Sequence, residues 1–203
     1  MRGALPLVIA AIEIALASTA LAADPRFSDW PCNQIKVPEI SVAAVWSGPS
    51  IDDVGDAWEQ DPVIRDLVAR LAARRTPLDE AEKAIADFIT GEQAERQRKA
   101  KLIVAGLFDT LNRERSAVMS GIERYSRRQQ DFAKQIRSSV RELHDLQNQP
   151  DQESKIDELA ARVEWETRIF EERRKTIGYV CEVPVLIEQR LFALARMIQQ
   201  ALE

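Results

Sequence analysis

The second half of the chain carries two heptad stripes separated by a short polar turn, and this pattern limits the possible folds more than any other. Apolar residues recur at alternating steps of three and four within 111–146 and again within 156–180, on either side of the turn at 148–151. Such spacing is typical of helices that pack as a coiled coil, and a short loop between two of them requires an antiparallel arrangement. We therefore predict an antiparallel coiled-coil hairpin over residues 115–180.

The two stripes stay in step along the whole hairpin. When the chain is folded at the turn, the stripe positions face one another throughout, because the residue numbers of every facing pair add up to the same total. In one of these layers Gln129 faces Arg173. A buried polar layer penalises slipped pairings, so these two residues are candidates for fixing the register of the hairpin. Tolerance of polar residues in a thin seam that is partly open to water explains the layer equally well.

Apolar residues before and after the hairpin also follow a helical period. The helices that this period predicts are 62–75, 77–90, 93–114 and 184–202. The third of them is apolar on all sides around 102–108, so other helices must surround it there. The sequence therefore predicts an all-α fold, in which a single helical domain over 61–203 consists of a small helical bundle base and the projecting hairpin. An irregular N-terminal arm precedes this domain.

Local signals mark several helix ends. Asp61 before Pro62 has the pattern of an N-cap followed by a proline in the first turn. Thr76 is expected to begin the next helix with a capping-box-like sequence. Gly91 should terminate that helix or mark a bend, and Pro184 should start the last helix or kink the one before it.

Five carboxylates fall between residues 50 and 61, which raises the question of a metal site. They are Asp52, Asp53, Asp56, Glu59 and Asp61. Their order does not match a calcium-binding EF-hand loop, which needs acids at alternate positions, a central glycine and a terminal glutamate. Acidic residues near a helix start explain the cluster better, because they favour the positive end of the helix dipole. We expect no metal ion to bind here.

Enzymatic chemistry finds little support in the sequence. The only histidine, His144, is expected on the outside of the hairpin, where it would be solvated. The chain contains no nucleophile elbow, no glycine-rich phosphate loop and no haem-attachment motif. We therefore expect neither catalytic residues nor a cofactor.

The first residues of the chain have the features of an export signal. Arg2 supplies a positive start, residues 5–17 form a short apolar run, and a small-residue cleavage site ends at Ala22. The run is shorter than the roughly 20 apolar residues that a membrane span needs. We predict that residues 1–22 are a cleaved signal peptide and that the protein is periplasmic or secreted. An uncleaved membrane anchor remains the alternative.

Cys32 and Cys181 are the only cysteines of the chain. Export would place them in an oxidising compartment, where a single pair most simply forms one disulfide. Closing a loop of roughly 150 residues stabilises a protein by roughly 5 kcal/mol in the chain-entropy model. Redox or metal chemistry is less favoured, because the chain lacks a Cys-x-x-Cys motif. The bond would tie the N-terminal arm to the root of the hairpin.

Residues 23–60 are expected to form the extended N-terminal arm, because this stretch is rich in proline and lacks a helical period. Trp30, Trp46 and Trp58 all lie within it. Large apolar rings on such an arm need a surface to pack against, and the helices offer one. The three tryptophans could alternatively line a ligand pocket or a partner surface beneath the arm.

Net charge and its distribution narrow the possible functions. The chain carries a net charge of -5, and the basic residues of the first hairpin helix alternate with acidic ones as on a solvated helix face, so we expect no nucleic acid as a partner. Three function classes remain. We favour a protein-interaction or scaffold component of the cell envelope, with a protein partner. The alternatives are a small-molecule or cofactor binder with a pocket beneath the arm, and a chaperone-like envelope-stress protein.

Overall fold

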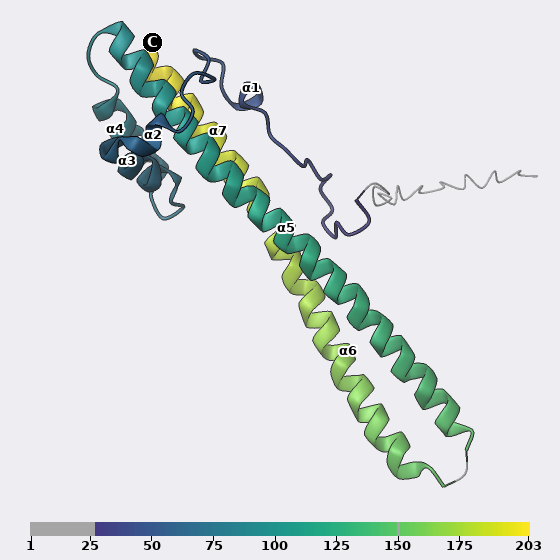
Figure 1. Cartoon of the computed structure of the whole chain (residues 1–203). Helices are drawn as coiled ribbons and strands as arrows, with labels where there is room; N and C mark the ends of the chain where they lie inside the picture. The colour runs from purple at the N-terminus through teal and green to yellow at the C-terminus, as the bar shows by residue number, and fades with distance from the viewer. Residues whose placement is uncertain (1–26, 150) are drawn as a thin grey trace, which may run out of the picture.

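The computed structural model describes residues 27–149 and 151–203, and within them the fold is all-α, as predicted (Figure 1). The helices of this part of the chain are α1 (Val42–Val45), α2 (Ala57–Gln60), α3 (Pro62–Ala72), α4 (Leu78–Phe88), α5 (Gln93–Gln147), α6 (Glu153–Cys181) and α7 (Val183–Leu202). The predicted signal peptide, residues 1–22, lies outside the described residues.

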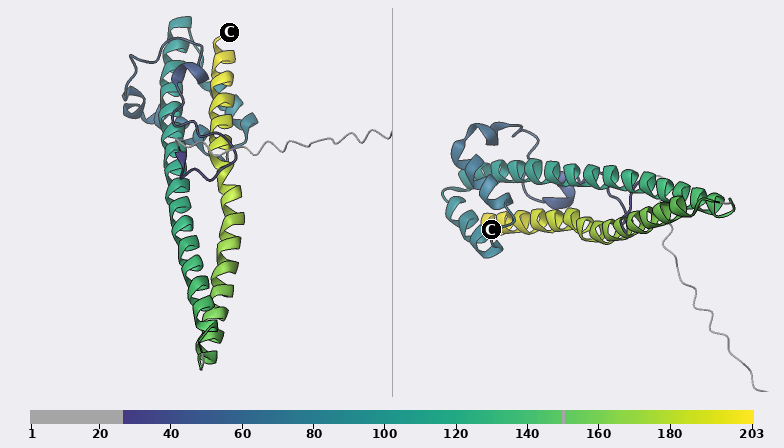
Figure 2. Two further views of the ribbon diagram at one scale, coloured as in Figure 1. Left: turned by 90° about the vertical axis from the view of Figure 1, so that its right-hand side faces the viewer. Right: turned by 90° about the horizontal axis from the view of Figure 1, so that it is seen from below.

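A single long helix sets the shape of the molecule. α5 has 55 residues and runs without a break from the base to the tip of the hairpin. α6 and α7 fold back along it in series, α6 over the hairpin and α7 over the base (Figures 1 and 2). The helical course is interrupted between α6 and α7 at Glu182. Pro184 lies in the first turn of α7, where its missing N–H costs no helical hydrogen bond. The antiparallel hairpin and the helical base are thus as predicted.

The core of the protein lies in the base, where α7 and the shorter helices surround the first third of α5. Its buried residues include Ile64, Val68, Leu71, Ile85, Ile103, Leu107, Leu111, Ile187, Leu191, Leu194 and Ile198. The stretch 102–108 was predicted to be enclosed on all sides, and most of its side chains are buried. Burial of regularly spaced apolar side chains from several helices provides the main stabilisation of this end of the molecule.

Two of the predicted helix signals are confirmed in detail. The Asp61 carboxylate accepts hydrogen bonds from the backbone N–H groups of Val63, at 2.9 Å, and Ile64, at 3.3 Å, so it caps α3 as expected. Gly91 follows α4 with a φ of 107°, a left-handed conformation that glycine adopts without the steric cost of a Cβ. This residue therefore lets the chain turn from α4 into α5.

The prediction for Thr76 is wrong. Its hydroxyl donates to the carbonyl of Arg70 at 2.7 Å, at the end of α3, and Pro77 occupies the N-cap position of α4 without a capping hydrogen bond. The reason is a tertiary contact, because the buried Arg190 side chain of α7 donates to the carbonyls of both Leu71 and Thr76. The α3–α4 connection is thus built around an arginine from another helix. Burial lowers the pKa of Arg190 below its ordinary value.

Helix boundaries in the base and in the arm also differ from the expected ones. α3 ends at Ala72 and α4 at Phe88, both earlier than predicted, and the arm expected to be irregular contains the short helices α1 and α2. Each of these short helices has only four residues, which is too few to show a helical period in the sequence.

Close packing of α2 and α3 against α5 depends on Gly106. A Cβ placed on Gly106 would lie 2.7 Å from Cγ2 of Val68 and 2.8 Å from Cε3 of Trp58. These distances are far below normal van der Waals contact, so α5 can approach the two helices only because this position lacks a side chain.

We therefore expect Gly106→Ala to destabilise the protein by about 1 to 3 kcal/mol through overpacking, although alanine has the higher helix propensity. Gly178→Ala is a matched control, because Gly178 lies in α6 and a Cβ there meets no atom within 4 Å. This second variant should gain up to about 1 kcal/mol from helix propensity alone. Urea unfolding of both variants measures the two effects, and equal shifts would show that α2 and α3 do not pack this closely on α5.

Candidate functional site: the uncovered face of the hairpin

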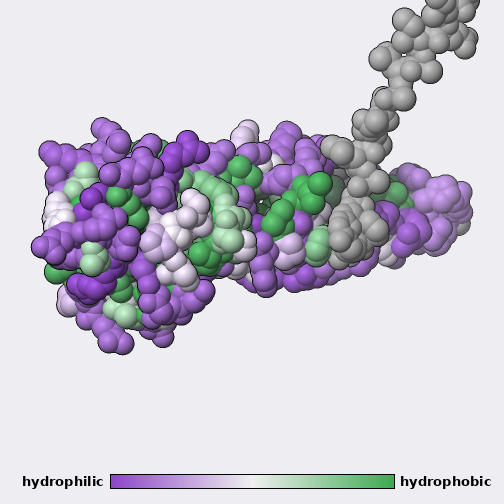
Figure 3. All heavy atoms as spheres, turned by 90° about the horizontal axis from the view of Figure 1, so that it is seen from above, coloured by the Kyte–Doolittle hydropathy of each residue, from purple (hydrophilic) through white to green (hydrophobic). Residues whose placement is uncertain are grey.

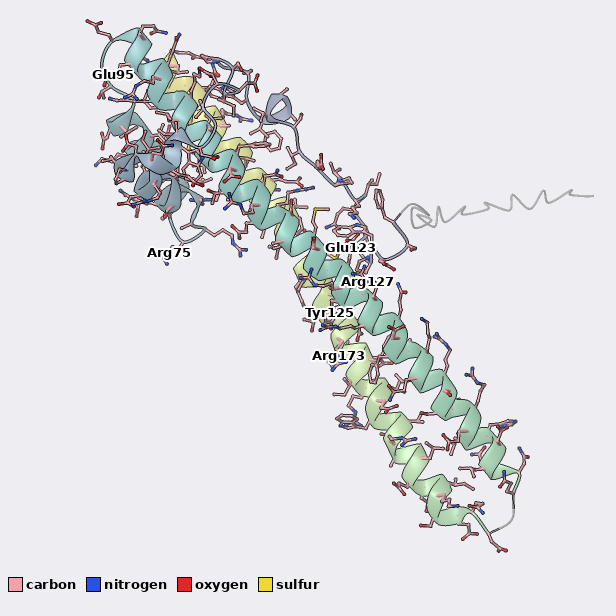
Figure 4. The ribbon with its side chains drawn as sticks, in the orientation of Figure 1. Arg75, Glu95, Glu123, Tyr125, Arg127 and Arg173 are labelled. Atoms are coloured by element: carbon pink, nitrogen blue, oxygen red, sulfur yellow. A yellow bond between two sulfur atoms is a disulfide. The ribbon has the colours of Figure 1, made fainter. Side chains whose placement is uncertain are left out.

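The two sides of the helical hairpin are covered by different segments near the base. The N-terminal arm runs along one side, which we call the arm face, and α3 and α4 pack on the opposite side (Figures 1 and 2). Figure 4 shows Glu123 and Arg127 on the arm face, whereas Tyr125 and Arg173 lie on the side turned away from it.

The arm face is held by a series of contacts to the arm. The Cys32–Cys181 disulfide forms as predicted, with a Cα–Cα distance of 5.6 Å. Asp29 pairs with Arg127 at 2.9 Å, and Lys36 pairs with Glu123. The arm is therefore fastened to the hairpin both covalently and by ion pairs.

Arg115 forms the most deeply buried of these contacts. Its side chain is only 2% exposed, and its Nε donates to the Glu188 carboxylate of α7 at 2.5 Å. The other guanidinium nitrogens donate to the backbone carbonyls of Pro38, at 3.2 Å, and Val37. Arg115 follows Leu111 by four residues and so occupies a position of the heptad seam. The structure shows that this position is polar because its side chain joins α5, α7 and the arm.

The opposite side is covered only at the base. Arg74, in the α3–α4 connection, pairs with Glu114 of α5 at 3.8 Å, and Arg190 of α7 reaches the end of α3 as described. Farther along the hairpin, beyond these residues, neither α3 nor α4 covers this side (Figure 1). We call this uncovered part the open face.

The open face presents large apolar side chains to solvent. Tyr179 is 80% exposed, Trp165 61% and Leu186 49%, and Val180 is also exposed. Multiples of seven residues separate Trp165, Tyr179 and Leu186. They therefore share one outer heptad position on the consecutive helices α6 and α7. Glu172 occupies the same heptad position between Trp165 and Tyr179, so the apolar side chains are interrupted once. Several large apolar side chains exposed on one face are typical of surfaces that bind another molecule.

This cluster lies near the base rather than at the tip. The tip around residues 147–152 is polar, as the sequence predicted. Figure 3 shows a different side of the molecule. There too, hydrophilic residues cover the far end of the hairpin, and apolar residues lie closer to the base. The exposed apolar side chains of the hairpin thus lie along its side rather than at its tip.

The three tryptophans predicted as a ligand or partner surface occupy separate places. Trp58 is buried against Gly106 of α5, and Trp46 is buried beside Phe192 of α7. Trp30 is half-buried and donates its indole N–H to the Gln34 carbonyl at 2.8 Å. These rings pack the arm onto the helices at three points.

Gln129 and Arg173 each contact the neighbouring layer of the seam. The Gln129 amide donates to the Phe170 carbonyl at 3.5 Å, and the Arg173 guanidinium lies 5.2 Å from the centre of the Phe132 ring. Gln129 is half-buried, whereas Arg173 is exposed. Their role in fixing the register stays a prediction.

The arm lines several cavities, and two of them lie beside ion pairs. One, beside Trp30 and the Arg115–Glu188 pair, has a volume of about 110 Å³. The other, of about 400 Å³, lies between residues 53–57 and the start of α5, where Lys101 pairs with Asp53 at 2.5 Å. The hydrogen bond from Lys101 lowers the pKa of the Asp53 carboxyl. Small-molecule sites usually measure about 300 to 1,000 Å³, so the cavity next to Trp30 is small for such a ligand, whereas the cavity at the start of α5 falls within this range.

Residues 27–149 and 151–203 contain no group of three or more histidine, cysteine, aspartate or glutamate side chains arranged to hold a metal ion. No helix of the described chain has both the length and the apolar character needed to cross a membrane. Comparison of the sequence with protein-family models and with curated proteins, and of the structure with solved structures, finds no match. The functional argument therefore rests on the geometry of the molecule itself.

Sequence reasoning missed Trp165, Tyr179 and Leu186 as candidate functional residues. A signal was present, since Trp165 and Tyr179 occupy an outer heptad position where a two-helix hairpin normally carries polar residues. The sequence did not show which side of the hairpin α3 and α4 would cover, so these residues could not be assigned to a free surface.

Proposed function

We propose that this protein is an exported scaffold component of the cell envelope, and that the open face of its hairpin docks a protein partner. The observation that carries the proposal is the stripe formed by Trp165, Tyr179 and Leu186, which neither the base nor the arm covers. Aromatic residues are enriched at protein interfaces because they bury a large area at a low cost in conformational entropy.

The remaining architecture supports this role. An intramolecular disulfide suits an oxidising compartment, which agrees with the export signal predicted for residues 1–22. The hairpin contributes little to the core of the base, and the Cys32–Cys181 bond and the Arg115 contacts hold it at a defined position. A fixed, projecting face is suited to present a binding surface without ordering a flexible segment on binding.

In-cell photocrosslinking tests the docking role. A photoreactive phenylalanine analogue at position 179 is expected to give a discrete adduct with a partner protein, while the same analogue at Gln130 is not. Gln130 is exposed and lies on the other side of the same hairpin, so it controls for random collision. The combined change Tyr179→Ala and Leu186→Ala should reduce crosslinking from position 165 by about tenfold, since the loss of two interface anchors costs at least about 1.4 kcal/mol. Equal adducts from positions 179 and 130 would refute docking at the open face.

A further inference from the structure

We infer that the open face binds an acidic amphipathic helix of its partner. This inference rests on the docking role proposed above and adds the chemistry of the partner. Three arginines beside the apolar stripe carry it, namely Arg124, Arg128 and Arg173. None of them forms an ion pair with any residue of 27–149 or 151–203.

The three arginines come from both helices of the hairpin. Arg124 and Arg128 are one helical turn apart on α5, so their side chains are neighbours on one face of that helix. Arg173 belongs to α6, and its backbone carbonyl accepts a hydrogen bond from the Tyr125 hydroxyl at 3.3 Å. Figure 4 shows Tyr125 and Arg173 side by side on the face turned away from the arm. Positive charge therefore borders the apolar stripe across the hairpin.

Several carboxylates in this region have basic partners within the protein, whereas Glu182, exposed between Tyr179 and Leu186, forms no ion pair within the described part of the chain. Glu114 pairs with Arg74 at 3.8 Å and Glu172 with Lys175 at 2.9 Å, and Asp131, farther along α5, pairs with Lys134 at 2.8 Å. The three unpaired arginines outnumber Glu182, so the net unmatched charge beside the apolar side chains is positive. A basic partner would face like charges, whereas an acidic one would match the surface and be steered towards it.

A helix fits the shape of the apolar stripe. The three residues of the stripe, Trp165, Tyr179 and Leu186, lie on one side of α6 and α7, which follow each other almost without interruption. At about 1.5 Å per residue they span about 30 Å. A partner helix laid along this line would place side chains from successive turns against them. The same side of α5 and α7 already packs against α3 and α4 in the base, so the partner would extend an existing helical layer.

The test uses the oxidised mature chain and a synthetic helical peptide of about 21 residues, long enough to cover the stripe. The peptide carries leucine along one face and glutamate elsewhere, and a matched peptide carries lysine in place of every glutamate. Fluorescence anisotropy should detect binding of the glutamate peptide, with an affinity that falls as salt is added. Arg124→Glu with Arg128→Glu should weaken binding by about tenfold or more. Arg137→Glu with Arg141→Glu should not, because these arginines have the same spacing on the opposite side of α5.

Other outcomes would separate this inference from the docking role. Equal binding of the two peptides, or no binding of the glutamate peptide, would overturn the acidic helix while leaving crosslinking from position 179 to test docking. Arginine-dependent binding to anionic phospholipid vesicles with no binding of the glutamate peptide would assign the surface to a membrane and overturn the inference. Self-association in sedimentation that is lost with Tyr179→Ala would assign the face to a second copy of the chain and overturn the inference.

Discussion

Loss of the Cys32–Cys181 disulfide is expected to lower the free energy of unfolding by about 3 to 5 kcal/mol. The bond joins residues 149 positions apart, so its removal greatly increases the conformational freedom of the unfolded chain. It also releases the arm from the root of the hairpin, where the Gln34 amide donates to the Cys181 carbonyl. Guanidinium unfolding of the oxidised protein and of the Cys32→Ser, Cys181→Ser variant measures this loss.

Two probes make the disulfide experiment specific. Three of the four tryptophans, Trp30, Trp46 and Trp58, lie in the arm and the fourth, Trp165, lies on α6, so tryptophan fluorescence reports mainly on the arm, while far-ultraviolet circular dichroism reports on the helices. Wild-type protein in a reducing agent should behave like the serine variant, and the reducing agent should leave the serine variant unchanged. Coincident unfolding curves for the oxidised protein and the serine variant would contradict a stabilising role for the bond.

Arg115→Met is expected to destabilise the protein by about 3 kcal/mol, at the lower end of the range for a broken buried ion pair. The change leaves the Glu188 carboxylate without its partner and removes the donors to the Val37 and Pro38 carbonyls. The lower end is expected because the Glu188 side chain is 30% exposed, so water stabilises part of its charge. Urea unfolding measures the difference.

A second variant and a control distinguish the lost ion pair from general disruption of α5. Adding Glu188→Leu to Arg115→Met should recover part of the stability, because no unpaired charge then remains at the α5–α7 contact. Arg113→Met is the matched control, since Arg113 pairs with Asp109 on an exposed surface and should cost less than about 1 kcal/mol. If Arg113→Met were as damaging as Arg115→Met, the buried contact would not be the cause.

The hairpin was predictable because both of its partners lie in one continuous stretch of sequence. A seam that steps by three and four, a polar turn and a shared register leave few other ways to bury the apolar side chains of residues 111–180. The Asp61 cap was predictable for a similar reason, because its hydrogen bonds go to residues only two and three positions away.

The remaining features depend on contacts between distant segments. Thr76 gave a local capping signal, but Arg190 reaches its carbonyl from 114 positions along the chain and helps to shape the α3–α4 connection differently. Arg115 was visible in the sequence as a charged residue in the heptad seam, but the sequence did not show which groups its side chain would bind. The open face could not be found from the heptad, since the pattern identifies outer positions such as Tyr179 but not the segments that cover them.

The uninterrupted course of α5 has a mechanical consequence. The returning side of the hairpin is interrupted at Glu182, between α6 and α7, and the Cys32–Cys181 bond lies beside this interruption. α5 continues past the same level as one helix. Ser120 and Gly121 lie at this level of α5 and are residue types at which helices can bend, but α5 is continuous through them, and the disulfide fastens the arm beside the break. We therefore expect a force applied at the tip to turn the whole molecule as one lever, so that a partner held on the side of the hairpin and anything bound at the base would move together.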